Sequence, residues 1–524
     1  MDSAMVLTSL KTLVENVHKA IYADEHTWLI ILVLVFLILI PLMLISKRWR
    51  KPVVNINDKR RENFEEWRKL VLRFGDFFDK RIRDFFRYKH IDIDKEDWDV
   101  SCEIVDRILK IVVSEMRKEA IKRFPGLAIG KTLRKQGSSR EGLKVCDPLE
   151  FDVLLPFLLE NVKTNNDAVF DNNGCIIPGL FKMRIMNPDK LPSWWRKCEL
   201  VSEERGKTYI NTSNFHKKVF ASLLDQTREG INKVLKKLTE NTNDEYAVVR
   251  SVISPSLKIT IHVHSENGLK SFTNILGFLE DLYVRGEGFP VYKEIDLEID
   301  LVPGILLSID EFPKNMLNRN SFISCERYGV MKWVNKKNHH IPKQDGDLIW
   351  RNSTCGYEKC IFDIAQKNSS QLYVMTACRL LKWALRKVTS STNNQLGSVL
   401  KSYHLKNLCF YCILFLTIPF ERKRLSGVTE ATGYFIEFIR LSLEAGNLPH
   451  FFHGNPCLSD IFPGSVFGEE KTKYNMFAMN SEETLVQARL GFKDFKRTLD
   501  GLYLERDQLD YKIIKLFACH LHLQ

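Results

Sequence analysis

Two stretches of alternating acidic and apolar residues are the part of this sequence best suited to chemistry. In residues 149–156, LEFDVLLP, a β-strand would bury one side and present Glu150 and Asp152 together on the other. Residues 294–300, EIDLEID, repeat the pattern and end at Asp300. Like charges crowd on such a face unless it is well solvated or holds a divalent cation. The alternatives are therefore the wet face of a sheet and a cation site.

A Gly-Ser-Ser turn precedes the first acidic stretch. Gly137 permits a tight turn, and backbone N–H groups with the hydroxyls of Ser138 and Ser139 can cradle phosphate oxygens. Taken alone, the tripeptide is more often an ordinary loop. Followed by acids on two strands, it matches what two-metal phosphoryl transfer requires: acids hold two cations, which activate an attacking hydroxyl and neutralise the leaving pyrophosphate.

Several segments, in the right order, resemble the nucleotidyltransferase core of the male abnormal 21 (Mab-21-like) family, which includes cyclic GMP-AMP synthase-like receptors. The resemblance runs from about residue 95 to the C-terminus. It rests on the Gly-Ser-Ser turn with DPLEFDVLLP at 147–156, SPSLKIT at 254–260, IDLVPGI at 299–305, WRNSTCGYE at 350–358, RLLKW at 379–383 and KSYH at 401–404. The resemblance implies a two-lobed α+β nucleotidyltransferase fold, with a mixed-sheet lobe and a helical lobe and the nucleotide in the cleft between them.

The resemblance also implies a role for individual residues. Glu150, Asp152 and Asp300 would be catalytic and would hold two Mg²⁺ or Mn²⁺ ions. Ser138 and Ser139 would contact the triphosphate. Four further residues would bind nucleotide: Lys382 a donor phosphate, Ser402 a phosphate, Tyr403 a base by stacking, and Arg351 the acceptor. The element at 350–358 departs from the family pattern at Asn352, Thr354 and Cys355.

Helices and strands must position these residues. Residues 98–124 have the apolar period of one long helix, which in the family is a spine joining both lobes. The sheet is predicted over residues 137–310, interrupted by a loop at Trp194-Trp195-Arg196 and by a helix at 215–238. Helices are predicted at 358–366, 372–388, 400–416 and 432–445. We therefore divide this part into a nucleotidyltransferase core at 95–345 and a C-terminal helical lobe at 346–524.

Length, charge and cysteine content narrow the classes of function. A chain of 524 residues is long enough for two lobes and an N-terminal extension. The net charge of +12 favours an anionic partner, and a basic run begins at the end of the long helix and continues beyond it: Arg117, Lys118, Lys122, Arg123, Lys131, Arg134 and Lys135. The run is either a solvated face or a platform for double-stranded RNA or DNA. The 12 cysteines show no paired framework and are expected to be mostly buried thiols.

The N-terminal region reads as a membrane anchor. Residues 1–27 carry the apolar stripe of an amphipathic helix. Residues 28–45 have no charge and are long enough to cross a bilayer, so we assign a transmembrane helix to 28–46 and a basic helical tether to 47–94. A cleaved signal peptide is disfavoured because the basic cluster follows the apolar run. These features predict a single-pass protein of the endoplasmic reticulum or outer mitochondrial membrane, with its C-terminal domain in the cytosol.

Two functions follow from these expectations. The first is a membrane-anchored enzyme that makes a cyclic dinucleotide from ATP and GTP, activated by nucleic acid in innate immunity. The second is a catalytically inactive membrane adaptor that binds nucleotide and recruits protein partners, as do relatives similar to the mitochondrial dynamics proteins or the inositol trisphosphate receptor-interacting proteins. The intact acids favour the enzyme and the anchor favours the adaptor.

Overall fold

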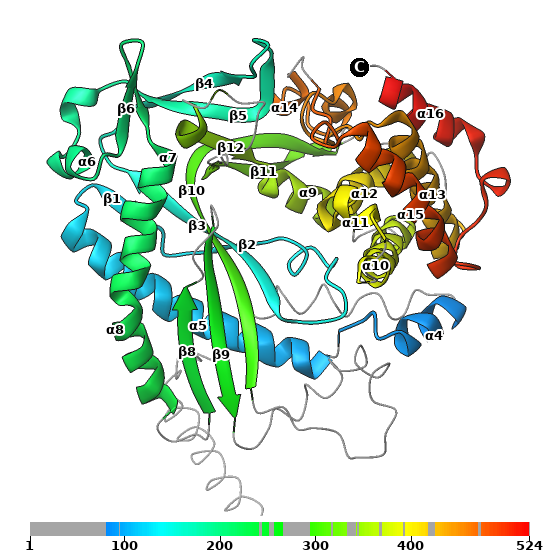
Figure 1. The fold of residues 1–524 in the computed structure, drawn as a ribbon, viewed down its shortest axis with the longest axis horizontal. Coiled ribbons are helices and arrows are strands. Elements are labelled where there is room, and N and C mark those ends of the chain that lie inside the picture. Colours follow the sequence, from blue (N-terminus) through cyan, green and yellow to red (C-terminus); the bar gives the residue numbers. More distant parts are fainter. Residues whose placement is uncertain are drawn as a thin grey trace, which may run out of the picture. The chain divides into compact units, whose positions relative to one another are not determined.

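The computed structural model describes residues 80–93, 95–239, 244–250, 256–265, 294–315, 318–332, 342, 345–365, 369–390, 394–417, 425–469 and 473–522. All of them belong to one compact unit, Glu66–Gln524. They form a mixed sheet and a group of helices (Figure 1), which confirms the predicted α+β class. The predicted segments 1–27 and 28–46, and most of 47–94, lie outside the described residues.

Twelve described strands form one sheet, in the order β1-β3-β10-β11-β12-β5-β7-β6, with β2, β4, β8 and β9 paired at its sides. The β3–β10 pair is parallel and the other pairs are antiparallel. The strands are β1 (Leu127–Ile129), β2 (Arg134–Gln136), β3 (Glu150–Leu159), β4 (Thr164–Phe170), β5 (Ile176–Ile185), β6 (Val201–Glu204), β7 (Lys207–Ile210), β8 (Asp244–Arg250), β9 (Leu257–Ser265), β10 (Glu294–Asn315), β11 (Asn318–Met331) and β12 (Ile349–Ser353).

The predicted alternation on β3 and β10 is confirmed. Phe151 and Val153 are buried, as are Leu297, Ile299 and Leu301 on the neighbouring strand. Phe151 stacks on Trp98 of the long helix α5 (Lys95–Arg123), with ring centroids 5.6 Å apart. Burying one side of the sheet against this helix turns the acidic side of both strands the other way.

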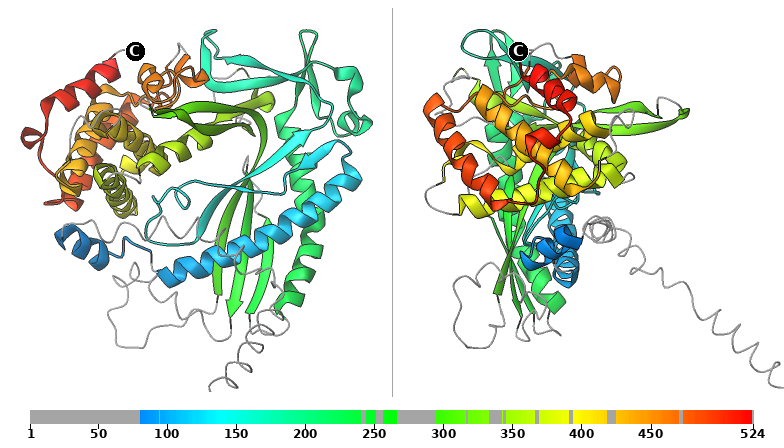
Figure 2. Two further views of the ribbon diagram at one scale, coloured as in Figure 1. Left: turned by 180° about the vertical axis from the view of Figure 1, so that it is seen from behind. Right: turned by 90° about the vertical axis from the view of Figure 1, so that its right-hand side faces the viewer.

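Helix α5 is the long helix expected at 98–124, and α8 (Ser222–Thr239) packs along it and against β8 (Figures 1 and 2). A π-helical segment at Phe215–Ala221 and the short helix α7 (Thr212–Asn214) lead into α8. The prediction of a loop at Trp194-Trp195 is wrong: these residues form helix α6 (Ser193–Lys197). Both indoles are buried, and Trp194 donates a hydrogen bond to the Pro125 carbonyl at 3.0 Å.

The helical part has its own apolar core, and the helices expected between 358 and 445 are confirmed. Helix α4 (Lys80–Tyr88) joins this core through Ile82 and Phe86, and Phe85 packs edge-on against Trp383. The other helices of eight residues or more are α9 (Cys355–Ala365), α10 (Ser369–Thr389), α12 (Ser402–Thr417), α13 (Val428–Ala445), α15 (Glu482–Thr498) and α16 (Tyr511–His522); α11 (Leu396–Val399) and α14 (Val466–Glu469) are single turns.

The prediction of a single-pass membrane protein of the endoplasmic reticulum or outer mitochondrial membrane is corrected. Within the part of the chain that the structure describes, no helix combines the length and the apolar character needed to cross a membrane. The predicted span itself, residues 28–46, lies outside that part.

Candidate functional site

Asp152 and Asp300 occupy paired positions on neighbouring strands. β3 and β10 run parallel, and Asp300 is the register partner of Asp152, so both side chains project from the same face. Burial raises the pKa of Asp152, and the neighbouring Asp300 carboxylate raises it further, whereas Lys406 and Lys144 oppose the rise. Negative charge is therefore crowded at this point, which is the condition that a bound cation relieves.

The Gly-Ser-Ser turn packs directly on this pair. Strand β2 pairs with β3 so that Gln136 is opposite Asp152, and Gly137 follows with φ of +74°. A Cβ at Gly137 would lie 1.9 Å from Oδ2 of Asp152, so only glycine fits. Ser139 is 1% exposed, and its hydroxyl has no hydrogen-bond partner among the described residues. A turn suited to phosphate and a carboxylate pair are thus in contact.

Glu150, the third predicted metal ligand, has a different partner. Its side chain is 71% exposed and accepts a hydrogen bond from Lys144 at 3.1 Å. Asp300 accepts a hydrogen bond from the hydroxyl of Ser256 at 3.1 Å. Within the described ranges, no three His, Cys, Asp or Glu side chains are grouped closely enough to hold a metal ion. The structure brings two of the three predicted ligands together, and their charge suits a divalent cation; binding of Mg²⁺ or Mn²⁺ by all three stays a prediction.

A buried charge triad lies behind the turn. The ammonium of Lys406 on α12 donates to Glu141 and to Glu358, both at 2.7 Å, and Thr354 donates to the other oxygen of Glu358 at 2.8 Å. Burial lowers the pKa of Lys406, but the two carboxylates outweigh it and the net shift is upward. Burial raises the pKa of Glu141, which Lys406 opposes. This triad ties the segment after the turn to two helices of the helical part.

Helix α10 holds the same segment from another side. Lys382 donates to the backbone carbonyl of Leu143 at 2.7 Å, and Arg386 forms an ion pair with Asp147. Burial lowers the pKa of Lys382 to about 8, and the charges of Lys144 and Lys406 also lower it. Lys382 therefore lies beside the turn, as expected for a group that reaches a phosphate, and its present contact is structural.

Tyr403 has a partly exposed ring, and its hydroxyl is held by a hydrogen bond. The side chain is 42% exposed, while its hydroxyl lies 3.1 Å from Nε2 of His450. Nδ1 of His450 accepts from the backbone N–H groups of Phe452 and His453, so Nε2 carries the proton and donates to Tyr403. Burial lowers the pKa of His450, which keeps it neutral. The exposed face of the phenol is available for stacking on a base.

The other two predicted nucleotide contacts lie near this tyrosine. Arg351 is exposed on β12, and its charge opposes the burial-driven rise in the pKa of Tyr403. Ser402 is exposed and is the first residue of α12, directly before Tyr403. The structure therefore places residues from the sheet, from the Gly-Ser-Ser turn and from the two helices α10 and α12 around one region: Asp152, Asp300, Ser139, Lys382, Arg351, Ser402 and Tyr403.

Sequence reasoning missed the residues that hold the site together. Lys406 and Glu141 are 265 positions apart, and no spacing announces their pairing. The sequence did point to two of these residues. Glu358 is the last residue of the family-like element at 350–358, and Lys406 lies one helical turn after Ser402 on the same helix. His450 has no sequence signal.

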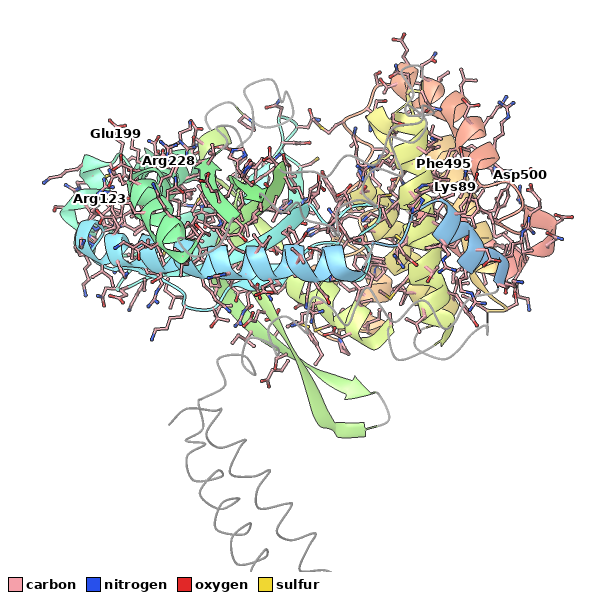
Figure 3. All side chains as sticks on the ribbon, turned by 90° about the horizontal axis from the view of Figure 1, so that it is seen from below. Lys89, Arg123, Glu199, Arg228, Phe495 and Asp500 are labelled. Carbon is pink, nitrogen blue, oxygen red and sulfur yellow. The ribbon has the colours of Figure 1, made fainter. Side chains whose placement is uncertain are left out.

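The predicted basic platform is largely neutralised. Arg123 lies at the C-terminal end of α5 (Figure 3) and contacts Ser222 and Gln226 of α8. Four of the predicted cations have carboxylate partners, which weakens any field on phosphates. These ion pairs are Lys118–Glu115, Lys122–Glu119, Arg134–Glu326 and Lys135–Asp106.

No family model matches the chain, and a search of curated proteins finds no match. Distant structural similarity is found to CdnC of E. coli MS115-1 with ATP, at 13% identity over 85% of this chain and 100% of that one, with a TM-score of 0.38. A CdnE cyclic dinucleotide synthase of Elizabethkingia meningoseptica with GTP and Apcpp has 11% identity over 81% and 99% of the two chains, with a TM-score of 0.34. A c-di-GMP synthase CdnE of Capnocytophaga granulosa has 9% identity over 86% and 99%, with a TM-score of 0.33.

Proposed function

We propose that this protein is a nucleotidyltransferase that joins nucleoside triphosphates, such as ATP and GTP, into a cyclic dinucleotide with release of pyrophosphate. One observation carries the proposal: the Gly137 turn packs on Asp152, and Asp300 is its register partner on the next strand. A turn suited to phosphate, in contact with one of two paired carboxylates, is what phosphoryl transfer needs. The resemblance of the sequence elements to the Mab-21-like family supports the same reaction.

Each residue has a definite task in this reaction. Ser138 and Ser139 hold the triphosphate, and Lys382 contributes positive charge beside the turn. Tyr403, oriented by His450, stacks on a base, and Arg351 meets the acceptor nucleotide. Asp152, Asp300 and Glu150 would hold two divalent cations, which would supply positive charge for the attacking oxygen and for the leaving pyrophosphate. Glu150 accepts a hydrogen bond from Lys144, and this ion pair would have to open for Glu150 to serve as a ligand.

The experiment uses the purified full-length protein. It is incubated with all four nucleoside triphosphates and Mg²⁺ or Mn²⁺, and the products are identified by mass spectrometry. A cyclic or linear dinucleotide that disappears in Asp152→Asn, and persists in Asp296→Asn, is the expected result. Asp296 is a matched control because it lies on the same strand, outside the carboxylate pair, and contacts His262. If the triphosphates stay intact under every condition, the proposed enzymatic activity is overturned.

We also propose that double-stranded RNA or DNA activates the enzyme, which would give it a role in innate immunity. The same reactions are run with and without long double-stranded RNA or DNA. Activation by either duplex should be lost when Arg123, which belongs to the predicted basic run and contacts α8, is changed to glutamate. Equal yields with and without duplex would remove this part and leave the reaction untouched.

A non-catalytic nucleotide-binding adaptor is the second candidate, and the Glu150–Lys144 pair favours it. In an adaptor this ion pair would persist with nucleotide bound, and nucleotide affinity would not change when divalent cations are chelated. In the enzyme, chelation should weaken triphosphate binding, because the carboxylate pair then repels the phosphates. Calorimetric titration with and without a chelator separates the two.

A further inference from the structure

Two buried thiols meet where the sheet joins the helical part. Sγ of Cys325 on β11 and Sγ of Cys360 on α9 are 2.9 Å apart. Cys325 is fully buried, and Cys360 is 8% exposed. The gap is well inside the usual contact distance of two sulfur atoms and about 1 Å longer than a disulfide bond. Little movement separates this contact from a covalent bond.

The backbone geometry at this point also suits a cross-link. At Gly356, in the first turn of α9, a Cβ would lie 2.2 Å from the carbonyl oxygen of Glu326, so α9 and β11 approach as closely as backbones can. Cys360 lies one helical turn after Gly356, on the same side of the helix, and Cys325 directly precedes Glu326. Figure 1 shows α9 lying against the β11 region of the sheet. The two cysteines thus lie beside a close approach of the two backbones.

We propose that Cys325 and Cys360 form a reversible disulfide that fastens helix α9 to strand β11 when the protein meets a peroxide. This inference does not depend on the proposed function. Cys360 is the thiol that peroxide reaches first, because it is 8% exposed, whereas Cys325 is fully buried.

The chemistry balances in two steps. The Cys360 thiolate attacks one oxygen of hydrogen peroxide, which breaks the O–O bond; with one proton, the products are a sulfenic acid and water. The Cys325 sulfur then attacks the sulfenic sulfur, its thiol proton leaves with the hydroxyl as a second water, and the S–S bond forms. Two thiols are oxidised and one peroxide is reduced. A dithiol reverses the change.

The proposed disulfide would act where the sheet meets the helical part, which is also where the buried triad lies. Helix α9 carries Glu358, which shares Lys406 with Glu141 behind the turn. A disulfide two residues further along α9 would hold Glu358 in register with the sheet. Oxidation should therefore stabilise the association of the sheet with the helical part.

The test uses full-length protein purified under reducing conditions and then treated with hydrogen peroxide. Peptide mass spectrometry after alkylation of free thiols should find the Cys325–Cys360 cross-link, lighter by two hydrogen atoms and removed by dithiothreitol. The thermal midpoint should rise by several degrees in the oxidised protein. Cys175→Ser, at an exposed cysteine, should leave both results unchanged.

Single variants identify the order of events. Cys325→Ser should accumulate a sulfenic acid at Cys360, trapped by dimedone, whereas Cys360→Ser should show neither cross-link nor rise in midpoint. Both replacements are nearly isosteric, and circular dichroism checks that they fold. If peroxide leaves both thiols free in the folded protein, or cross-links them only after unfolding in urea, the proposal is overturned.

Discussion

Gly137 and Asp152 are in such close contact that no side chain fits between them: a Cβ on residue 137 would lie 1.9 Å from Oδ2 of the carboxylate. The turn expected to hold phosphate is therefore in direct contact with the carboxylate expected to hold a cation. Any displacement of one displaces the other. The first prediction follows from this contact.

Gly137→Ala should reduce dinucleotide formation by roughly a hundredfold, because the clash moves the turn or the carboxylate out of position. Gly174→Ala is the matched control. Its φ of +80° imposes similar backbone strain, about 1 kcal/mol, but nothing lies within 4 Å of the added Cβ. Product yield and urea unfolding are measured for both. Equal losses in the two variants would mean that backbone strain alone, and not the contact with Asp152, causes the effect.

Asp152→Asn should lower activity by roughly a hundredfold to a thousandfold. The same change should raise the free energy of unfolding when this is measured at pH 8 without divalent cations. The folded pKa of Asp152 is raised above 3.8, so its charge costs stability at high pH. The cost fades as the pH falls from the folded pKa towards 3.8, since the folded state then binds the proton first. Urea titrations at pH 8 and pH 4 should therefore show a gain that shrinks in acid. The exposed Asp189→Asn should change little at either pH.

Lys406→Met should destabilise the protein by about 3–5 kcal/mol, because it leaves Glu141 and Glu358 buried without a cation. Adding Glu141→Gln and Glu358→Gln should restore part of this loss. Without Lys406, burial raises the pKa of Glu141 further, so the folded variant takes up protons more readily and the loss should be smaller at pH 6 than at pH 9. Chemical denaturation measures the free energy of unfolding of the single and triple variants. A triple variant that is no more stable than the single variant would contradict the buried charge triad.

Triphosphate affinity should fall as the pH rises through about 8, because Lys382 loses its charge there. Lys382→Met should bind more weakly at pH 7 and lose this pH dependence. The free protein should behave oppositely: between about pH 8 and 10.5 the unfolded chain holds the extra proton, so stability gains from rising pH. Lys387→Met, at an exposed lysine of the same helix, is the control for affinity. An unchanged pH profile in Lys382→Met would remove Lys382 from the site.

Tyr403→Ala should weaken nucleotide binding by about 1–3 kcal/mol, the usual contribution of stacking. Tyr403→Phe keeps the ring but loses the hydrogen bond from His450, so its loss should be smaller. His450→Gln removes the imidazole that accepts from two backbone N–H groups and donates to the Tyr403 hydroxyl. Tyr403 then loses the partner that orients it, so nucleotide binding should weaken when Tyr403 is present. In Tyr403→Ala, the same histidine change should add little. Fluorescence titration of a nucleotide analogue measures the double-mutant cycle. Additive losses would show that His450 acts separately from the tyrosine.

The sequence alone determined the local features of the site. Alternation on residues 149–156 and 294–300 specifies two strands with acids on one side, since the period of two follows from backbone geometry. The apolar period of residues 98–124 likewise specifies one helix, whose Trp98 then packs behind Phe151. These features depend on neighbours in the chain. The short helix at Trp194 was missed because its stability comes from burying two indoles, a tertiary effect.

Only the tertiary structure decided which distant residues meet. The parallel register that pairs Asp152 with Asp300 depends on strands far apart in the sequence. It also decided that Lys406 is shared by Glu141 and Glu358, that Glu150 turns to Lys144, and that Cys325 touches Cys360. Such contacts are set by how whole elements pack, and a charged or sulfur-bearing side chain gives no periodic signal of its partner. Local periodicity therefore predicted the elements, and packing between them assembled the site.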